Sequence, residues 1–433
     1  MKRRLAFNRS RPGRQQTFEF IERSGRHDRW FKLTILGATL LAIAVVAVVM
    51  PRGRYLIASL PSLARQGVRL TLGLPTPRAE IEQEWRRFRA QGIADSHRAL
   101  IRVYQGEKPP YQALMRYAGL DPVHGLLRWG NYNRTLLLPS TVFEPDDTGR
   151  SYRLRPCTQS IWLRQLTIKG VLMFFLVPDR PDLREAIRGT TGIPVERSRQ
   201  STNSWGLRGP EPDTGAPLRG IVLGDSYMQG LFIGDDDTPP ECLRRHLETH
   251  LKTKASILNT GHLGYSPEQY YYSLLAFADR FPAQFVIVSV FSNDFGDLFE
   301  VLDGKGDWVE GKYWLDRIAD FCRGRNWPCL FVSVPIKSQM LNRRKTAFYP
   351  GAISNILNDS AMTFLDPTDV FVNANLDLVN EADRRGRRPY GCPLFNDDIS
   401  DGHFSALGAE VWAGAVGRRL VLLLEQNGKI TNK

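Results

Sequence analysis

The residues best placed to do chemistry begin with a serine that ends an apolar run. Ser226 follows the run Gly220–Leu223 and the two turn residues Gly224 and Asp225. This pattern predicts a strand that leads into a helix, with the serine hydroxyl at the carboxyl end of the strand. A helix N-terminus and free backbone N–H groups favour negative charge that develops there. Ser226 is therefore a candidate nucleophile, provided that a histidine base and an orienting acid exist elsewhere.

The remaining groups that such a site needs are present further along the chain. His403 would take the hydroxyl proton of Ser226 and later return it, and Asp401 would orient the imidazole. The backbone N–H groups of Ser226 and Gly264 and the side-chain amide of Asn293 would form an oxyanion hole. Together these residues predict acyl transfer through a serine.

The elements that must position these residues are predicted from about residue 218 onward. Short apolar runs alternate there with helical segments, which indicates a parallel sheet covered by helices on both faces, a three-layer α/β/α domain. Sites in such sheets form beyond the carboxyl ends of the strands. The periodicity does not give the strand order. The expected strands are Gly220–Leu223, Ser256–Leu258, Phe285–Phe291, Cys329–Val334 and Thr363–Leu365.

The four residues Ser226, Gly264, Asn293 and His403, in this order, resemble the residues that name the SGNH hydrolases, also called the GDSL family. The resemblance covers roughly residues 200–425. It implies a flavodoxin-like α/β/α fold with a parallel sheet, and hydrolysis or transfer of acyl groups on oxygen. It implies no metal and no organic cofactor.

Three positions depart from the family pattern. Tyr227 stands where leucine is common, and Ser292 stands near the position of a usual glycine. The family commonly places an aspartate three residues before the histidine, whereas Asp401 stands two before His403. That spacing is similar to relatives that transfer O-acetyl groups on polysaccharides, and Asp398 is an alternative partner.

Two further segments bear on the substrate. Residues 203–209 are similar to a lead-in found in bacterial, membrane-anchored members, and residues 332–339 are similar to a segment of relatives that modify exopolysaccharides. The resemblance thus implies an O-acylated envelope glycan as substrate, with an acyl-serine intermediate. Water as acceptor would make an esterase and a sugar hydroxyl an O-acyltransferase.

The basic character of the chain lies mainly in its first 32 residues. The formal net charge is +13, and residues 1–32 alone hold ten Lys and Arg against three acidic residues, a net +7. This distribution argues against a nucleic-acid partner.

Residues 33–50 carry no charge, and a run of at least about 17 apolar residues can span a bilayer. We therefore expect a single-pass inner-membrane anchor with residues 1–32 in the cytoplasm and the catalytic domain periplasmic or otherwise extracytoplasmic; a cleaved signal peptide is the competing interpretation.

The regions flanking the predicted hydrolase domain are less informative. Residues 51–195 are expected to form a mostly helical or mixed extracytoplasmic region, with a helix at 79–103 and a buried element at 171–177. The SGNH-like domain is assigned to residues 196–425, and residues 426–433 are a tail. Envelope proteins are expected as partners.

Other candidate side chains have simpler explanations. His262 is more consistent with loop packing than with substrate contact. His246 and His250 stand four apart on a predicted helix without an evident third ligand, so no metal site is predicted. Cys322 and Cys329 are close enough in sequence for a small disulfide loop, with free buried thiols as the equal alternative.

Two other function classes remain open. The altered residues around Asn293 and His403 are compatible with a catalytically idle scaffold module in a polysaccharide machine. The adjacent anchor and the apolar run 55–75 are compatible with a lipase or thioesterase that acts on membrane lipid.

Overall fold

A computed structural model describes the chain between residues 91 and 430, with gaps. The described residues are 91, 94–95, 97–102, 104–106, 112, 115–116, 119–129, 135–162, 166–168, 171–173, 176–181, 198–295, 308–341, 362–386, 392–396 and 402–430. The predicted tail 1–32, anchor 33–50 and apolar run 55–75 lie outside them. In the described part, every helix is too short or too polar to cross a membrane.

Five parallel strands form the central sheet, in the order β11-β10-β12-β13-β14. The chain therefore runs outward in both directions from the pair β10–β12, which is the doubly wound order of a flavodoxin-like fold. This confirms the expected α/β class and supplies the strand order. The strands are β10 (Leu218–Leu223), β11 (Ala255–Asn259), β12 (Phe285–Val290), β13 (Cys329–Ser333) and β14 (Thr363–Leu365).

The inner strands are apolar because both of their faces are covered. All residues of β12 are buried, and so are Ile221, Val222 and Leu223 of β10. Gly220 of β10 is paired in register with Phe285, and a Cβ at Gly220 would lie 2.2 Å from the Phe285 ring. Glycine at this position thus lets the Phe285 ring approach the backbone of β10 closely.

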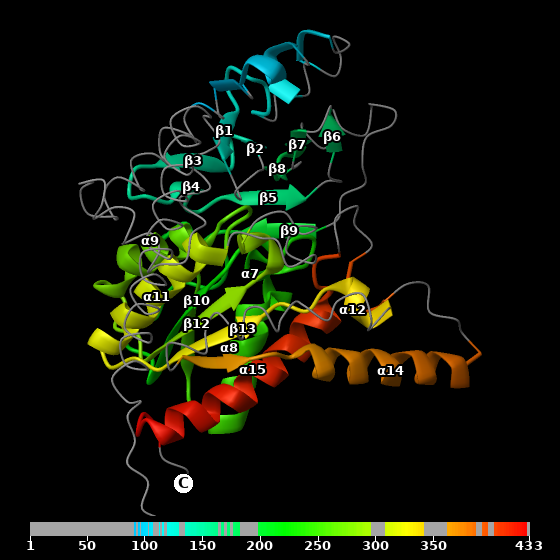
Figure 1. Ribbon diagram of the computed structural model, residues 1–433. Coiled ribbons are helices and arrows are strands. Elements are labelled where there is room, and N and C mark those ends of the chain that lie inside the picture. Colours follow the sequence, from blue (N-terminus) through cyan, green and yellow to red (C-terminus); the bar gives the residue numbers. More distant parts are fainter. Residues whose placement is uncertain are drawn as a thin grey trace, which may run out of the picture. The chain divides into compact units, whose positions relative to one another are not determined.

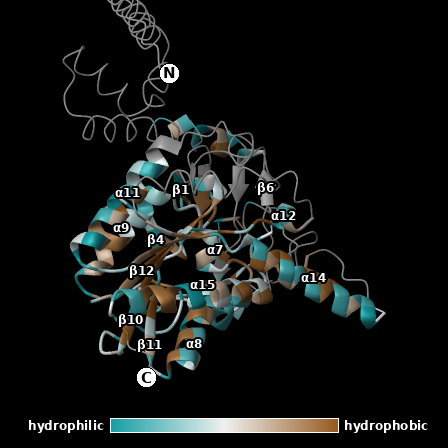
Figure 2. Cartoon of the chain, turned by 60° about the horizontal axis from the view of Figure 1, so that its bottom comes forward, coloured by the Kyte–Doolittle hydropathy of each residue, from teal (hydrophilic) through white to brown (hydrophobic). Residues whose placement is uncertain are grey.

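Helices cover the sheet in two layers. α8 packs against α15, and α9 packs against α11 (Figure 1). Hydrophobic residues concentrate along the strands between them (Figure 2). The helices are α7 (Ser226–Gln229), α8 (Pro239–Leu251), α9 (Pro267–Ala278), α11 (Trp308–Gly324), α12 (Lys337–Leu341), α14 (Thr368–Arg384) and α15 (Ala406–Gln426), with 3-10 turns η1 (Asp235–Asp237) and η2 (Ser292–Phe295).

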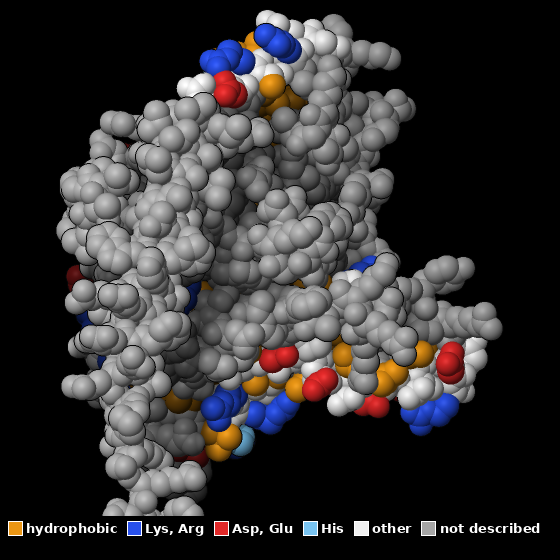
Figure 3. Space-filling model, viewed as in Figure 1, with side chains coloured by type: hydrophobic (Ala, Val, Ile, Leu, Met, Phe, Trp, Pro, Cys, Tyr) orange, Lys and Arg blue, Asp and Glu red, His pale blue; other side chains and the backbone are white. Residues whose placement is uncertain are grey.

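The α14 helix presents apolar and charged side chains together at the surface (Figure 3). Phe371 and Val372, near its start, are buried, whereas Leu376 is 49% exposed. Its last turn carries Arg384 and is followed by Arg385, which pairs with Glu381.

The described residues between 126 and 201 form short strands, and we call them the β-rich region; its last strand lies just inside the predicted 196–425 domain. Of the two expectations for the region before that domain, mixed structure holds for the described residues and mostly helical structure does not. The helical residues in this part of the described chain lie between 91 and 116 and at 181. Some of the strands, such as residues 135–138 and 171–173, are apolar runs of three or four residues that form strands rather than helices. The strands are β1 (Leu126–Trp129), β2 (Thr135–Leu138), β3 (Phe143–Asp146), β4 (Ser151–Leu154), β5 (Gln159–Trp162), β6 (Leu166–Ile168), β7 (Val171–Met173), β8 (Leu176–Pro178) and β9 (Ser198–Ser201).

These strands pair into small sheets of their own. β1, β2, β7 and β6 form one, β3 pairs with β4, and β8, β5 and β9 form a third. The element predicted at 171–177 is divided between β7 and β8. Side chains of Phe143, Tyr152, Leu154 and Trp162 are nevertheless buried in the same core cluster as the strand β10. The β-rich region and the hydrolase-like domain therefore share one apolar core.

Candidate active site

The nucleophile candidate lies on a sharp turn between β10 and α7. Asp225 caps α7 by accepting a hydrogen bond from the backbone N–H of Tyr227 at 2.9 Å. Gly230 ends the helix with φ 76°, a left-handed conformation that favours glycine. Ser226 is the first residue of this one-turn helix and is 7% exposed. The predicted strand–turn–helix position of Ser226 is thus confirmed.

Ser226 and His403 are brought together although 177 residues separate them. His403 Nε2 lies 2.8 Å from Ser226 Oγ. His403 is 9% exposed, so the pair is largely removed from water. For His403 to act as a base, Nε2 must accept the serine proton, which requires the ring proton of the resting enzyme to be on Nδ1.

The loop that carries His403 is held by Asn396. The backbone N–H of Asn396 donates to the His403 carbonyl at 2.7 Å. Its side-chain amide donates to the carbonyl of Phe404 at 2.9 Å and to that of Leu231 at 3.4 Å. Leu231 follows α7 and its cap, so Asn396 links the histidine loop to the nucleophile turn.

Aromatic rings surround the imidazole. The Tyr227 ring lies 4.7 Å from the His403 ring, and Phe232 lies 6.1 Å from it, between ring centroids. Phe291 and Phe404 pack in turn against Tyr227 at 4.6 and 5.0 Å. The tyrosine that departs from the family pattern thus forms part of the apolar wall of the candidate base.

The loop of residues 259–266 lies directly against α7. A Cβ at Gly261 would be 2.5 Å from the backbone nitrogen of Gln229, so only glycine allows this approach. The Gln229 side-chain carbonyl accepts a hydrogen bond from the Leu263 N–H at 2.6 Å. Gly264, the predicted oxyanion donor, follows with φ 73°. The structure thus places Gly264 in the loop packed on the nucleophile helix.

The side chains of two predicted site residues, Asn293 and Asp401, lie outside the described part of the structure. Asn293 lies in η2, directly after β12, while its side chain is outside the described part of the structure. Asp401 and its alternative Asp398 both lie outside the described residues. Their predicted roles therefore stay predictions.

Two buried carboxyl groups lie behind the site. Asp225 is 1% exposed, and its Oδ2 has no hydrogen-bond partner among the described residues; burial raises the pKa of this carboxyl to about 6. Asp294 accepts hydrogen bonds from Tyr270 Oη at 2.9 Å and from the Phe291 N–H at 2.8 Å. Burial and the charge of Asp225 raise the pKa of Asp294 well above its usual value. Of the two, Asp225 also caps α7.

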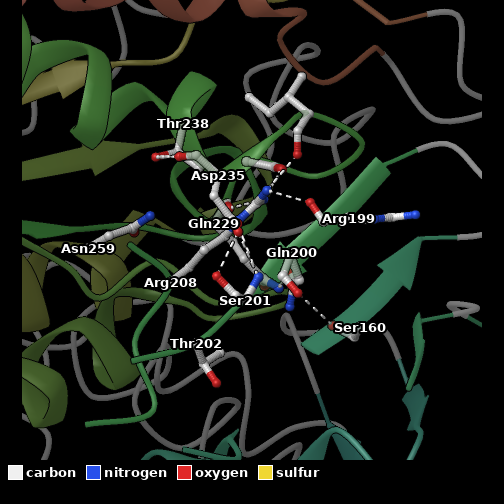
Figure 4. Close-up of polar contacts among 12 residues, drawn as sticks. Ser160, Arg199, Gln200, Ser201, Thr202, Arg208, Gln229, Asp235, Thr238 and Asn259 are labelled. Atoms are coloured by element: carbon white, nitrogen blue, oxygen red, sulfur yellow. Dashed lines mark hydrogen bonds and ion pairs between the residues drawn. The ribbon is translucent and has the colours of Figure 1, made fainter. Parts of the chain in front are cut away.

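A fully buried arginine supports the segment that follows α7 (Figure 4). Arg208 Nη1 donates to the carbonyls of Gln229, at 2.8 Å, and Gly230, and Nη2 donates to that of Ile233. Arg208 Nε pairs with Asp235 at 2.8 Å, and Asp235 also accepts from the backbone and hydroxyl of Ser201 in β9. The planar guanidinium thus satisfies several carbonyls at once and ties this segment to β9.

His262 is a packing residue, as the sequence indicates. Its Nδ1 lies 3.1 Å from the Thr260 carbonyl, and its Nε2 accepts a hydrogen bond from the Leu154 N–H at 3.2 Å. These contacts fit a neutral ring that donates at Nδ1 and accepts at Nε2. Burial lowers the pKa of His262 to about 4.

The remaining histidine and cysteine candidates form no site in the described structure. His246 and His250 stack on α8, and the described residues hold no group of three potential ligands arranged around a metal. All five cysteines, including Cys322 and Cys329, are free thiols in this structure.

Comparison with known proteins gives matches to solved structures alone. No family model matches the chain, and no curated protein does. Similar solved structures include a lipolytic protein of the G-D-S-L family from Desulfitobacterium hafniense (14% identity, 46% of this chain and 98% of that chain, TM-score 0.34). A second is a psychrotrophic esterase from Pseudoalteromonas sp. (14% identity, 48% of this chain and 98% of that chain, TM-score 0.33). A third is a Clostridium thermocellum family 3 carbohydrate esterase (13% identity, 49% of this chain and 99% of that chain, TM-score 0.33).

Each of these matches covers slightly less than half of this chain. At 13–14% identity and TM-scores of 0.33–0.34 they do not by themselves assign an activity. We therefore infer the activity from the chain's own residues.

Several supporting residues are not evident from the sequence. Gln229 and Asn396 are ordinary polar residues in sequence, and their partners lie 34 and up to 165 residues away. Arg208 carries a signal, since it lies in the segment 203–209 that resembles a family lead-in. The sequence does not show, however, that Arg208 donates hydrogen bonds to the carbonyls of Gln229, Gly230 and Ile233.

The buried neutral His262 predicts acid sensitivity. Its pKa is about 6.5 in an unfolded chain and about 4 when folded, so its stabilising effect is present above pH 6.5 and lost as the pH falls toward 4. This lowering of the His262 pKa corresponds to about 3 kcal/mol of unfolding free energy. We expect the difference in unfolding free energy between the wild type and His262→Gln to shrink by about 2–3 kcal/mol between pH 7 and pH 4, measured by denaturant titration. A difference that does not vary with pH would contradict this role.

Arg208→Lys should slow the reaction of Ser226 with a fluorophosphonate, a reagent that reports activated serines. An ammonium cannot reproduce the guanidinium fork, and a small displacement of α7 should cost roughly 10- to 100-fold in rate. The matched control is Arg219→Lys, because Arg219 also donates to backbone carbonyls but at the opposite end of β10. Equal labelling rates in both variants would show that Arg208 does not position the nucleophile.

Proposed function

We propose that this protein is a serine-dependent esterase of the SGNH type, which hydrolyses or transfers acyl groups through an acyl-Ser226 intermediate. The observation that carries the proposal is the 2.8 Å contact between Ser226 Oγ and His403 Nε2 at the carboxyl end of the parallel sheet. A serine and a base in hydrogen-bond contact form the activated pair that nucleophilic catalysis requires. Its position at the point where the strand order reverses is where α/β sheets bind ligands.

The first half of the reaction transfers the acyl group to the enzyme. As Ser226 Oγ attacks the acyl carbonyl carbon, its proton passes to His403 Nε2. The carbonyl oxygen becomes an oxyanion, stabilised by the N–H groups of Ser226 and Gly264 and the amide of Asn293. When the bond to the leaving alcohol breaks, His403 returns the proton to the alcohol oxygen, and Asp401 would hold the imidazolium in place.

The second half regenerates the serine. An incoming hydroxyl group, from water or from a sugar, loses its proton to His403 and attacks the acyl carbonyl. The oxyanion collapses, the bond to Ser226 Oγ breaks, and His403 returns the proton to Ser226. Water makes the enzyme an esterase, and a sugar hydroxyl makes it an O-acyltransferase.

For the substrate and location we propose an O-acylated glycan of the cell envelope and a periplasmic or extracytoplasmic site. Support for both comes from the sequence: the uncharged run 33–50 behind a basic tail, and the segments 203–209 and 332–339 that resemble envelope members of the family. The bilayer would be contacted through residues 33–50, and envelope proteins are proposed as partners.

Fluorophosphonate labelling of the full-length chain, read by peptide mass, tests the proposal. We expect label on Ser226 in the wild type and none in Ser226→Ala. His403→Ala should label far more slowly, because loss of a general base typically costs 10²–10⁴-fold. A folded wild-type chain that takes no label would sink the enzyme proposal and favour the idle scaffold module. Turnover that rises from acetyl to long-chain p-nitrophenyl esters would favour the lipase or thioesterase alternative.

A further inference from the structure

The strand β4 of the β-rich region contacts the loop that carries the predicted oxyanion donor. The Tyr152 hydroxyl donates a hydrogen bond to the Leu263 carbonyl, and the Tyr265 hydroxyl donates to the Tyr152 carbonyl. The rings of Tyr152 and Tyr265 pack edge to face at 5.2 Å. Two residues further along β4, the Leu154 N–H donates to His262 at 3.2 Å. Three hydrogen bonds thus join Tyr152 and Leu154 of this strand to the 259–266 loop.

The carbonyl that Tyr152 binds belongs to the peptide unit of the predicted oxyanion donor. Leu263 C=O and Gly264 N–H are parts of one planar amide, and in a trans amide they point in opposite directions. A donor on the oxygen therefore restricts the direction of the carbonyl and, with it, the direction of the N–H. It also polarises the amide, because hydrogen bonds in a chain strengthen one another in a low-dielectric interior.

The neighbouring amide is fixed as well. The Leu263 N–H donates to the side-chain carbonyl of Gln229 at 2.6 Å. Gln229 is the last residue of α7, the helix that Ser226 begins. Leu263 is thus held on one side by the nucleophile helix and on the other by the β-rich region.

We propose that Tyr152 is a positioning residue of the oxyanion hole, which orients and polarises the Leu263–Gly264 amide so that the Gly264 N–H stabilises the oxyanion. The inference rests on the proposed function and deepens it. It also gives the β-rich region a role in catalysis, because the hydrolase-like domain of residues 196–425 supplies the reacting groups and β4 completes their geometry.

The surroundings of Tyr152 suit this role. The side chain is fully buried, and burial raises the pKa of the phenol well above its usual value, so the hydroxyl keeps its proton. Since its partner is a carbonyl oxygen, the hydroxyl must be the donor. The hydroxyl is therefore a donor to the Leu263 carbonyl at neutral pH.

Tyr152→Phe in the full-length chain tests the inference, because it removes the hydroxyl and keeps the ring. We expect kcat for p-nitrophenyl acetate to fall roughly 10-fold, less than the 10²–10³-fold expected when a whole oxyanion donor is lost. KM should change little, because the ground-state carbonyl gains less from this donor than the oxyanion does. The rate of fluorophosphonate labelling should fall in parallel.

Tyr271→Phe is the matched control. Tyr271 is also a buried tyrosine, 8% exposed, and its hydroxyl accepts a hydrogen bond from Arg317 at 2.9 Å, between α9 and α11. The Tyr271→Phe variant should lose as much thermal stability as Tyr152→Phe. Its kcat per labelled Ser226 should stay at the wild-type value.

The outcomes separate the inference from the function on which it rests. A kcat per labelled site in Tyr152→Phe equal to that of Tyr271→Phe would overturn the inference and leave the esterase intact. A fall confined to the fraction of labelled sites would also overturn it, since that result reports folding alone. A wild-type chain without Ser226-dependent turnover would overturn both.

Discussion

The contact between Ser226 Oγ and His403 Nε2 depends on one property of parallel sheets. The carboxyl ends of adjacent strands meet at one edge, so loops that follow strands far apart in the chain converge there. Ser226 follows β10, Asn293 follows β12, and the 259–266 loop begins at the end of β11. His403 is brought to the same edge by the loop before α15. The rest of the described structure keeps these loops in place.

Two layers of support hold these loops. Within the hydrolase-like domain, Asn396 ties the histidine loop to the segment after α7, and Gln229 ties α7 to the 259–266 loop. From the β-rich region come Tyr152 and Leu154, which bind the 259–266 loop, and Ser201, which reaches the segment after α7 through Asp235 and Arg208. In most of these bonds one partner is a backbone group, either a carbonyl that accepts or an N–H that donates. Because a backbone group can belong to almost any residue type, the sequence does not indicate these contacts.

This explains what can be predicted from the sequence. The β10, β12 and β13 strands are buried on both faces, so they appear as continuous apolar runs, and the α/β class and the strand positions follow from them. Ser226 and His403 can be found because catalysis at serine restricts the residue types that can be used. The β-rich region is not predictable in the same way, because strands of three or four residues carry too little periodicity to be told from other short apolar segments. The role of Tyr152 cannot be predicted either, since its partner lies 111 residues further along the chain.

The most direct test of the account is to trap the acyl-enzyme. The full-length chain would be mixed with p-nitrophenyl acetate, quenched in acid within the first turnovers, and digested for peptide mass analysis. We expect one added acetyl group on the peptide that contains Ser226, and none on that peptide in Ser226→Ala. Turnover of the ester by the wild-type chain with no acetyl group on Ser226, or with the acetyl group on another residue, would contradict it.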